Sequence, residues 1–174
     1  MAIVTLVPYR AYEQQCSVAS ALELLGERWT LLIMRDVLLG SRHFNQLKRS
    51  LGVAPNILSD RLDTLVGHGL LERRADAEHP DSPTYHPTQA GIDVNPVLMT
   101  LMEWGDKHAT PAGGPPRISV HTTCGHDAHA KLHCSHCGEE VLPRESAVRP
   151  GPGASERVRE LGVLPRRAPE PAGS

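Results

Sequence analysis

The chain has 174 residues, a formal net charge of −2 and an isoelectric point near 6.5, a length that suits one ordinary domain with an appendage. Hydrophobic residues make up 40% of it, so a sizeable core can be buried, whereas aromatic residues make up only 3%. This scarcity of aromatic side chains argues against a protein that stacks unpaired bases. The near-neutral charge argues against a general polyanion binder, although it leaves room for a local basic face.

Targeting and membrane segments are not evident in the sequence. The apolar patch at residues 3–8 has no basic segment before it, and other apolar runs are far shorter than the ~20 residues that span a bilayer. We therefore expect a cytoplasmic protein with reduced thiols and no membrane partner.

Composition divides the chain into four segments. Residues 13–108 have the apolar periodicity of a folded domain, and residues 109–117 have the Pro and Gly content of a linker. Residues 118–142 hold a cluster of Cys and His. Residues 143–174 contain six prolines, and we expect them to form a disordered tail with a transient helix at 156–161.

The first domain is predicted to consist of short helices followed by a hairpin and a longer helix. Two of the helices are joined by a turn that contains Gly52, and a two-stranded hairpin follows them, which describes a winged helix-turn-helix. The expected fold class is therefore mainly α with a small β-hairpin wing. Helices are predicted at residues 17–25, 29–39, 43–50, 55–67 and 88–108, strands at 69–75 and 84–87, and the hairpin tip at 76–83.

DNA contacts are expected from the second helix of the pair, at residues 55–67. In this fold that helix enters the major groove with its N-terminal side chains at the base edges, while cations nearby meet the phosphate backbone. The candidate DNA-binding residues are Arg42, Lys48, Arg49, Asn56, Ser59, Asp60, Arg61, Arg73 and Arg74.

A competing interpretation is that these side chains are only the solvated faces of a small helical domain, since any such helix exposes Arg and Lys. The order of the elements favours the DNA-binding interpretation. Arg61 itself has two roles open to it: it can reach a phosphate or guanine, or pack over Leu65 and pair with Asp60 or Asp63. The wing tip at 76–81 carries three carboxylates, so we do not expect it to read the minor groove.

Several motifs of the first domain stand in a distinctive order. They read CSVASALELLGERWTLLIMRD at 16–36, GSRHFNQL at 40–47, ILSDRLDTL at 57–65, GLLER at 69–73 and YHPTQAG at 85–91, followed by Trp104 and Gly105. In this order they resemble the HxlR-type (MarR-like) winged helix-turn-helix transcriptional regulators of bacteria. The resemblance implies a nucleoid-associated DNA-binding homodimer that represses or activates transcription, of which we favour repression. It also implies a dimer interface made by the N-terminal segment and the last long helix.

Cys16 directly precedes the first predicted helix, whose N-terminus favours a thiolate. In several members of the resembling family a cysteine near this position senses electrophiles or oxidants, so Cys16 is a candidate redox sensor. The regulator would then respond to an oxidant, an electrophile or a small ligand. The alternative is an inert, partly buried packing residue, because Cys is among the most buried residue types.

Two knuckle motifs make up the Cys/His cluster of residues 118–142. They are H-x-x-C-G at 121–125 and C-x-x-C-G at 134–138, and each places two ligands on one turn before a Gly that permits a tight bend. Such spacing predicts a zinc-ribbon-like module with a closed, structural Zn²⁺ site. The expected ligands are His121, Cys124, Cys134 and Cys137, with His126 as the alternative imidazole.

Other interpretations of the cysteines and of the whole chain stay open. The cluster would be a disulfide in an oxidising compartment, or a ribbon that has lost its metal. A catalytic zinc is disfavoured because the Glu that deaminases place two residues after a His is missing. We expect no enzyme, since no nucleophile triad, phosphate loop or carboxylate pair is present. The alternative function is a winged-helix and zinc-ribbon interaction module that does not read DNA sequence.

Overall fold

The computed structural model describes residues 12, 14–76, 79, 82–142 and 144–161. These residues belong to two compact units, Met1–Ala128 and His129–Ser174. In the described ranges, no helix combines the length and the apolar character needed to cross a membrane. The last thirteen residues of the predicted tail lie outside the described residues.

The first unit contains most of the regular structure. Its described elements, in chain order, are α1 (Ser17–Leu25), α2 (Thr30–Leu38), α3 (Phe44–Leu51), α4 (Pro55–Gly67), β1 (Leu71–Arg74), β2 (Thr84–Pro87), α5 (Gln89–Ile92), α6 (Asn95–His108), β3 (Val120–His121) and β4 (His126–Asp127). This order confirms the mainly α winged helix-turn-helix that the sequence predicts.

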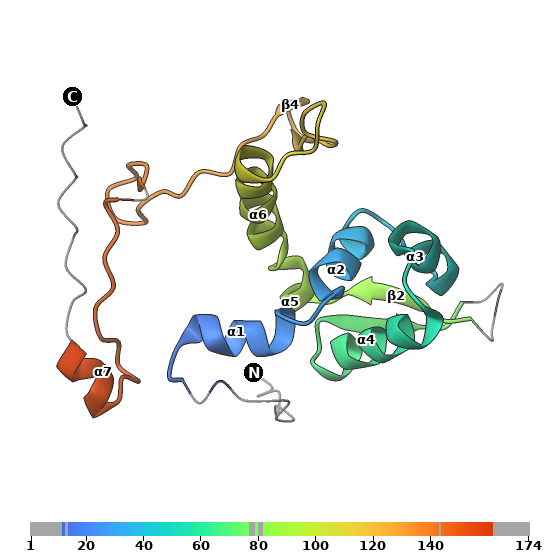
Figure 1. The fold of residues 1–174 in the computed structure, drawn as a ribbon, viewed down its shortest axis with the longest axis horizontal. Coiled ribbons are helices and arrows are strands. Elements are labelled where there is room, and N and C mark those ends of the chain that lie inside the picture. The colour runs from blue at the N-terminus through green and yellow to red at the C-terminus, as the bar shows by residue number, and fades with distance from the viewer. Residues whose placement is uncertain (1–11, 13, 77–78, 80–81, 143, 162–174) are drawn as a thin grey trace. The chain divides into compact units, whose positions relative to one another are not determined.

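Three helices and one hairpin form the body of this unit, and α1 and α6 lead away from them (Figure 1). Strands β1 and β2 pair antiparallel, from Leu71 opposite Pro87 to Arg74 opposite Thr84. The hairpin is tied to the loop before α3, because the Tyr85 N–H donates to the Arg42 carbonyl at 2.8 Å. The wing is thus held against the helix pair.

The core lies where α2, α3, α4 and the hairpin meet. Apolar residues repeat every three or four positions along these helices, so one stripe of each faces inward. Its fully buried side chains are Ile33, Met34, Val37, Leu47, Leu58, Leu62, Leu65 and Leu71. At roughly 1.5–3 kcal/mol for each such side chain, this cluster stabilises the unit against the conformational entropy of the chain.

The predicted helix at 88–108 is wrong as a single helix. The structure divides it into α5 and α6, with Asp93 and Val94 between them. Pro96 stands at the second position of α6, where its missing N–H costs nothing, whereas inside a continuous helix it would remove a hydrogen bond to Ile92. The start is as predicted: the Thr88 hydroxyl caps α5 by accepting from the Gly91 N–H at 3.2 Å.

The second unit has little regular structure in its described part. An isolated bridge pairs His133 with Glu140. The Lys131 ammonium donates to the Glu140 carboxylate at 2.7 Å, an exposed contact across the same turn. Helix α7 (Glu156–Leu161) lies where the sequence predicts a short helix in the tail.

Candidate nucleic-acid interface

The turn between α3 and α4 sets the angle of the second helix. Gly52 ends α3 with a φ of 62°, a left-handed conformation that favours glycine, and its N–H donates to the Lys48 carbonyl at 3.0 Å. At the other end of α3, the Gln46 carboxamide oxygen accepts from the N–H groups of Arg42 at 2.9 Å and His43 at 3.1 Å. Both ends of α3, the first helix of the pair, are therefore held by hydrogen bonds.

Gln46 was not among the predicted site residues. The signal that finds it is the capping pattern, in which a Gln or Glu three residues after the first cap position reaches back to it. Gln46 stands three residues after His43 in this way. Its carboxamide oxygen positions the start of α3, the first helix of the pair.

The N-terminal end of α4 is open and polar. Pro55 stands in the first turn of α4. The N-cap residue, Ala54, has no side chain that could accept a hydrogen bond, so the first backbone N–H groups of the helix are not capped by it. Asn56, Ser59 and Asp60 are all exposed on this helix. This end presents hydrogen-bond donors and acceptors of the kind that read base edges or hold phosphates.

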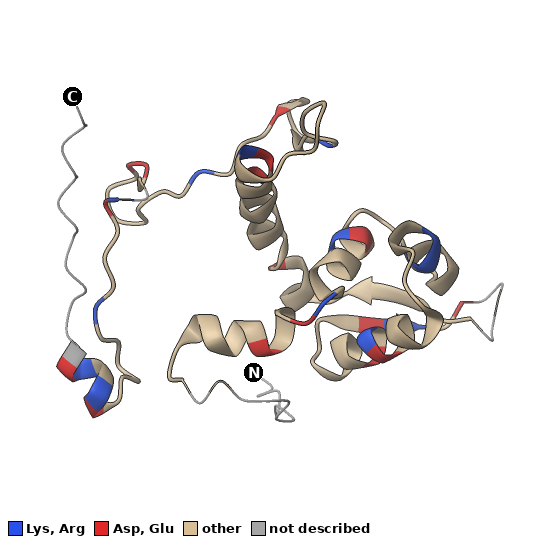
Figure 2. Cartoon of the chain, in the orientation of Figure 1, with Lys and Arg blue, Asp and Glu red and all other residues tan. Residues whose placement is uncertain are grey.

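Lys48 and Arg49 supply positive charge beside this surface. Both are exposed in the last turn of α3, and in the described part of the chain neither side chain has an ion-pair or hydrogen-bond partner. Figure 2 shows them as the blue band on α3, whereas α4 carries both signs of charge. These two cations are therefore available to phosphates.

Arg42 is placed differently from the prediction. Its guanidinium donates to the Val37 carbonyl at the end of α2, and the residue is half-buried. It fixes the loop between α2 and α3, which leaves less of its side chain to reach a phosphate.

Arg61 is also held within the fold. Its Nη2 lies 3.0 Å from Oε2 of Glu27, whereas the ion-pair partner that the sequence offers as one of two roles is Asp60 or Asp63. Its buried Nε has no partner among the described residues. Arg61 therefore connects α4 to the segment between α1 and α2.

The wing arginines pair with nearby carboxylates. Arg73 pairs with Asp63 of α4 and lies over the Tyr85 ring, with its Cζ 5.8 Å from the ring centroid. The Arg74 Nε donates to Glu72 at 2.8 Å. All of these charged groups are substantially exposed, so DNA phosphates can compete for the arginines.

His86 lies at the base of the wing with a pKa lowered by burial first, and then by the positive charges of Arg74 and Arg42. Its Nε2 lies 3.0 Å from the Thr84 hydroxyl. The neutral imidazole is therefore favoured, and His86 adds little positive charge to the wing near neutral pH.

Cys16 is the residue that precedes α1, with an extended backbone and an exposed, unpaired thiol. Its carbonyl accepts from the Ser20 N–H at 3.0 Å, which begins the helix. Within this single chain the Cys16 thiol is more accessible than the partly buried packing residue of the alternative interpretation. Its role as a sensor stays a prediction.

The first knuckle lies in the first unit. The His121 Nδ1 is 3.3 Å from the Cys124 Sγ, and Gly125 follows with a φ of 74°. The Gly125 N–H donates to the His121 carbonyl at 2.7 Å, which closes the turn. His126, the alternative ligand, lies opposite His121 in the β3–β4 pair.

The second knuckle, in the second unit, has the same backbone design. Gly138 has a φ of 76°, and its N–H donates to the Cys134 carbonyl at 2.8 Å. The pKa of the Cys134 thiol is lowered by the backbone N–H of Cys137, then by that of His136 and by the Cys137 thiol. Nowhere in the described ranges do three or more His, Cys, Asp or Glu side chains form a group able to hold a metal ion.

Comparisons with known proteins agree with this fold. A family model described as HxlR-like helix-turn-helix matches residues 24–112. The HTH-type transcriptional regulator Rv3095 of Mycobacterium tuberculosis is 46% identical over 142 residues, which cover 82% of this chain and 90% of the relative. The family match ends at residue 112, and the alignment with Rv3095 spans 142 residues. The likeness to Rv3095 therefore extends into the chain beyond the family match.

Solved structures show the same likeness. The transcription factor PA1374 from Pseudomonas aeruginosa is 39% identical, with a TM-score of 0.59, over 84% of this chain and 99% of that one. Another transcription factor, PA1607, is 27% identical, with a TM-score of 0.68, over 77% of this chain and 94% of that one. The chain therefore belongs to the HxlR-like helix-turn-helix family and is a DNA-binding transcriptional regulator, not an enzyme.

Proposed function

We propose that the chain is a repressor that binds duplex operator DNA as a homodimer, with α4 in the major groove. The observation that carries the proposal is the exposed start of α4, with Asn56 and Ser59, together with Lys48 and Arg49 at the end of α3, two cations without a partner among the described residues. The polar side chains offer contacts to base edges, and the cations offer contacts to phosphates.

Binding to DNA from the region upstream of its own coding sequence tests this function. Fluorescence anisotropy over a range of salt concentrations should give a complex that survives unlabelled competitor DNA and weakens steeply with salt. If no sequence preference appears even at low salt, the proposal is overturned in favour of an interaction module.

A second copy of the chain is the partner we propose for α1 and α6. Helix α6 has no buried residue, and its Val97 and Trp104 are 48% and 60% exposed; on α1, Val18 is 66% exposed. Apolar faces of this kind are costly to leave in water and are typical of homodimer interfaces. Trp104→Glu should convert a dimer to a monomer in sedimentation measurements, whereas Lys107→Glu on the same helix should not. A wild-type monomer would contradict this assignment.

We also propose a structural zinc ion held by His121, Cys124, Cys134 and Cys137. Each knuckle, taken by itself, supports this: a left-handed Gly closes each turn, and Cys134 already accepts N–H groups that stabilise a thiolate. Metal analysis of the purified chain should find about one zinc per chain. Cys137→Ser should lose it and Cys16→Ser should keep it; a metal-free wild type overturns the proposal.

Cys16 is the proposed redox-responsive group of the regulator. Its support is the exposed thiol at the start of α1, a helix that also carries the proposed dimer face. Hypochlorite or a quinone should release wild-type protein from its operator, and Cys16→Ser should stay bound. Equal release of both proteins would show that Cys16 is not the sensor.

A further inference from the structure

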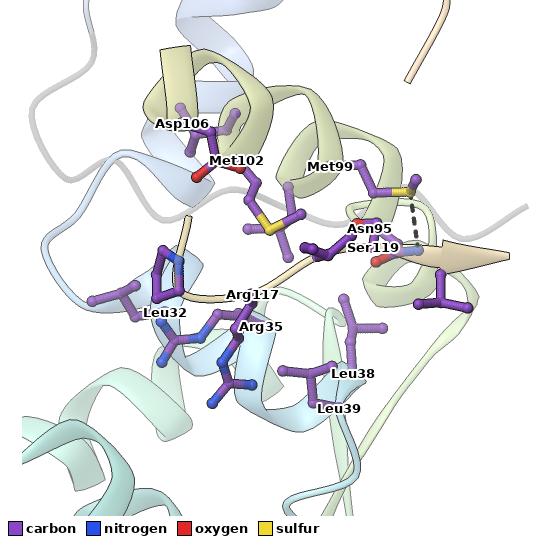
Figure 3. Close-up of a pocket in the computed structure, with 15 residues that line it drawn as sticks. Leu32, Arg35, Leu38, Leu39, Asn95, Met99, Met102, Asp106, Arg117 and Ser119 are labelled. Atoms are coloured by element: carbon purple, nitrogen blue, oxygen red, sulfur yellow. Dashed lines mark hydrogen bonds between the residues drawn. The ribbon is translucent and has the colours of Figure 1, made fainter. Parts of the chain in front are cut away.

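A cavity of about 530 Å³ lies in the first unit, between α2, α6 and residues 116–120 (Figure 3). Its size falls within the ~300–1,000 Å³ typical of small-molecule sites. It is separate from the exposed surface of α3 and α4 that faces DNA in the proposed function, since neither helix contributes a residue to its lining.

The walls of this cavity are mainly apolar. Leu32 and Leu38 come from α2, Met99 and Met102 from α6, and Ile118 from the segment after the predicted linker. Leu32 is 41% exposed and Ile118 63% exposed, so a ligand that covered them would remove apolar surface from water. Thioether side chains adapt to ligands of different shape, so these walls suit a flexible or aryl apolar body.

Charged side chains also line the cavity, and they determine which polar group a ligand can carry. Arg35 is held by Asp36, since both its Nε and its Nη2 lie 2.8 Å from Oδ1 of that residue. Arg117 lines the same cavity, and no ion pair or hydrogen bond engages its side chain within the described residues. In Figure 3 the guanidinium groups of Arg35 and Arg117 point to the same side of the cavity. A carboxylate matches the planar fork of a free guanidinium.

Asp106 limits the charge that a ligand can carry. It lines the cavity from the C-terminal half of α6 (Figure 3), so a ligand with an anionic group at each end would bring one of them toward a like charge. A single carboxylate on an apolar body fits the lining best.

We propose that this cavity binds an amphipathic monocarboxylate, with its apolar body against Met99 and Met102 and its carboxylate on Arg117. The proposal deepens the regulator function, on which it rests, by giving the class of effector. The cavity lies between α2, which packs in the core of the DNA-binding part, and α6, which carries the proposed dimer face. An occupied cavity would thus bias the position of one against the other.

Methyl resonances of ¹³C-labelled methionine test the site directly. Met99 and Met102 line the cavity, whereas Met34 is fully buried in the core and serves as an internal control. Decanoate and phenylbutyrate should shift the signals of Met99 and Met102 saturably and leave that of Met34 in place. No shift, or equal shifts of all three, overturns the proposal.

Substitutions test the carboxylate contact. Arg117→Gln should weaken decanoate binding about fivefold, the size expected for a partly solvated ion pair, while Arg149→Gln in the second unit should not weaken it. Decanol should bind wild type about as weakly as decanoate binds Arg117→Gln. If decanol and decanoate bind wild type equally well, the cavity does not select carboxylates. The methionine signals are read without DNA, so their failure is distinct from a failure to bind an operator.

Discussion

Arg61 and Glu27 join α4, the helix proposed to enter the major groove, to the segment between α1 and α2, with Nη2 and Oε2 3.0 Å apart. Their side chains are 26% and 35% exposed, so the pair is shielded more than the wing pairs at the surface. A shielded pair between distant segments fixes their relative position, which here includes the direction of α4. Arg61 is therefore expected to orient the proposed DNA-binding surface through its contact inside the fold.

A double-mutant cycle measures this connection. Arg61→Met and Glu27→Gln should each lower the free energy of unfolding, and together they should show a coupling of about 0.5–1 kcal/mol. The exposed pair Arg74 and Glu72 is the control and should show less. Chemical denaturation of the four proteins of each cycle gives the values. Additive effects in the first cycle would mean that the ion pair does not hold α4.

Removing the cations of α3 should weaken binding to all DNA sequences alike. In the double variant Lys48→Gln with Arg49→Gln, the slope of log affinity against log salt should fall by about one for each phosphate that the variant no longer neutralises. The control is Arg149→Gln with Arg157→Gln, which removes the same charge from exposed positions in the second unit. A control that weakens binding as much as the α3 variant would show that only net charge matters.

Asn56 should contribute to sequence preference more than to general affinity. Asn56→Ala is expected to cost about 1–3 kcal/mol with the operator and little with unrelated DNA, because a side chain in the groove discriminates between base pairs. Thr64→Ala is the control, since this exposed residue lies toward the other end of α4 and its hydroxyl donates to the Asp60 carbonyl at 2.7 Å. Competition assays with both DNA types measure the difference. Equal losses on both would assign Asn56 to a phosphate.

The helix pair, its turn and the wing were predictable because each has a local signal. Gly52 marks the turn, Pro55 marks the start of α4, and apolar residues at every third or fourth position mark the buried stripes. The break before α6 also has a local signal in Pro96, since proline is excluded from helix interiors. That prediction failed because the apolar periodicity continues across the break.

The partners of the predicted DNA-binding arginines were not predictable. Nothing near Arg61 in the sequence points to Glu27, because the two residues meet only when α4 packs beside the segment before α2. In the same way, the Val37 carbonyl accepts from Arg42 only once α2 has ended beside it. The sequence therefore predicted which cationic residues lie near the helix pair. Which of them pair with other side chains or carbonyls depends on tertiary packing.

Gly91 illustrates a residue whose necessity only the structure explains. It is buried in α5, where a Cβ would stand 2.2 Å from the Leu70 carbonyl oxygen and 3.2 Å from the Met34 Cε. The backbone oxygen cannot move aside as a flexible side chain can, so α5 and the start of the wing would have to separate. Gly91→Ala should therefore lower the free energy of unfolding by about 2–4 kcal/mol.

Gly67 provides the matched control for this substitution. It is also helical, at the end of α4, but a Cβ there would meet nothing within 4 Å. Gly67→Ala should raise the free energy of unfolding by up to about 1 kcal/mol, because alanine restricts the unfolded chain and favours the helix. Urea denaturation of both variants tests the pair. Similar stabilities of the two variants would mean that α5 can shift to accommodate the added methyl group at little cost. The close approach of Gly91 to Leu70 would then not be needed for stability.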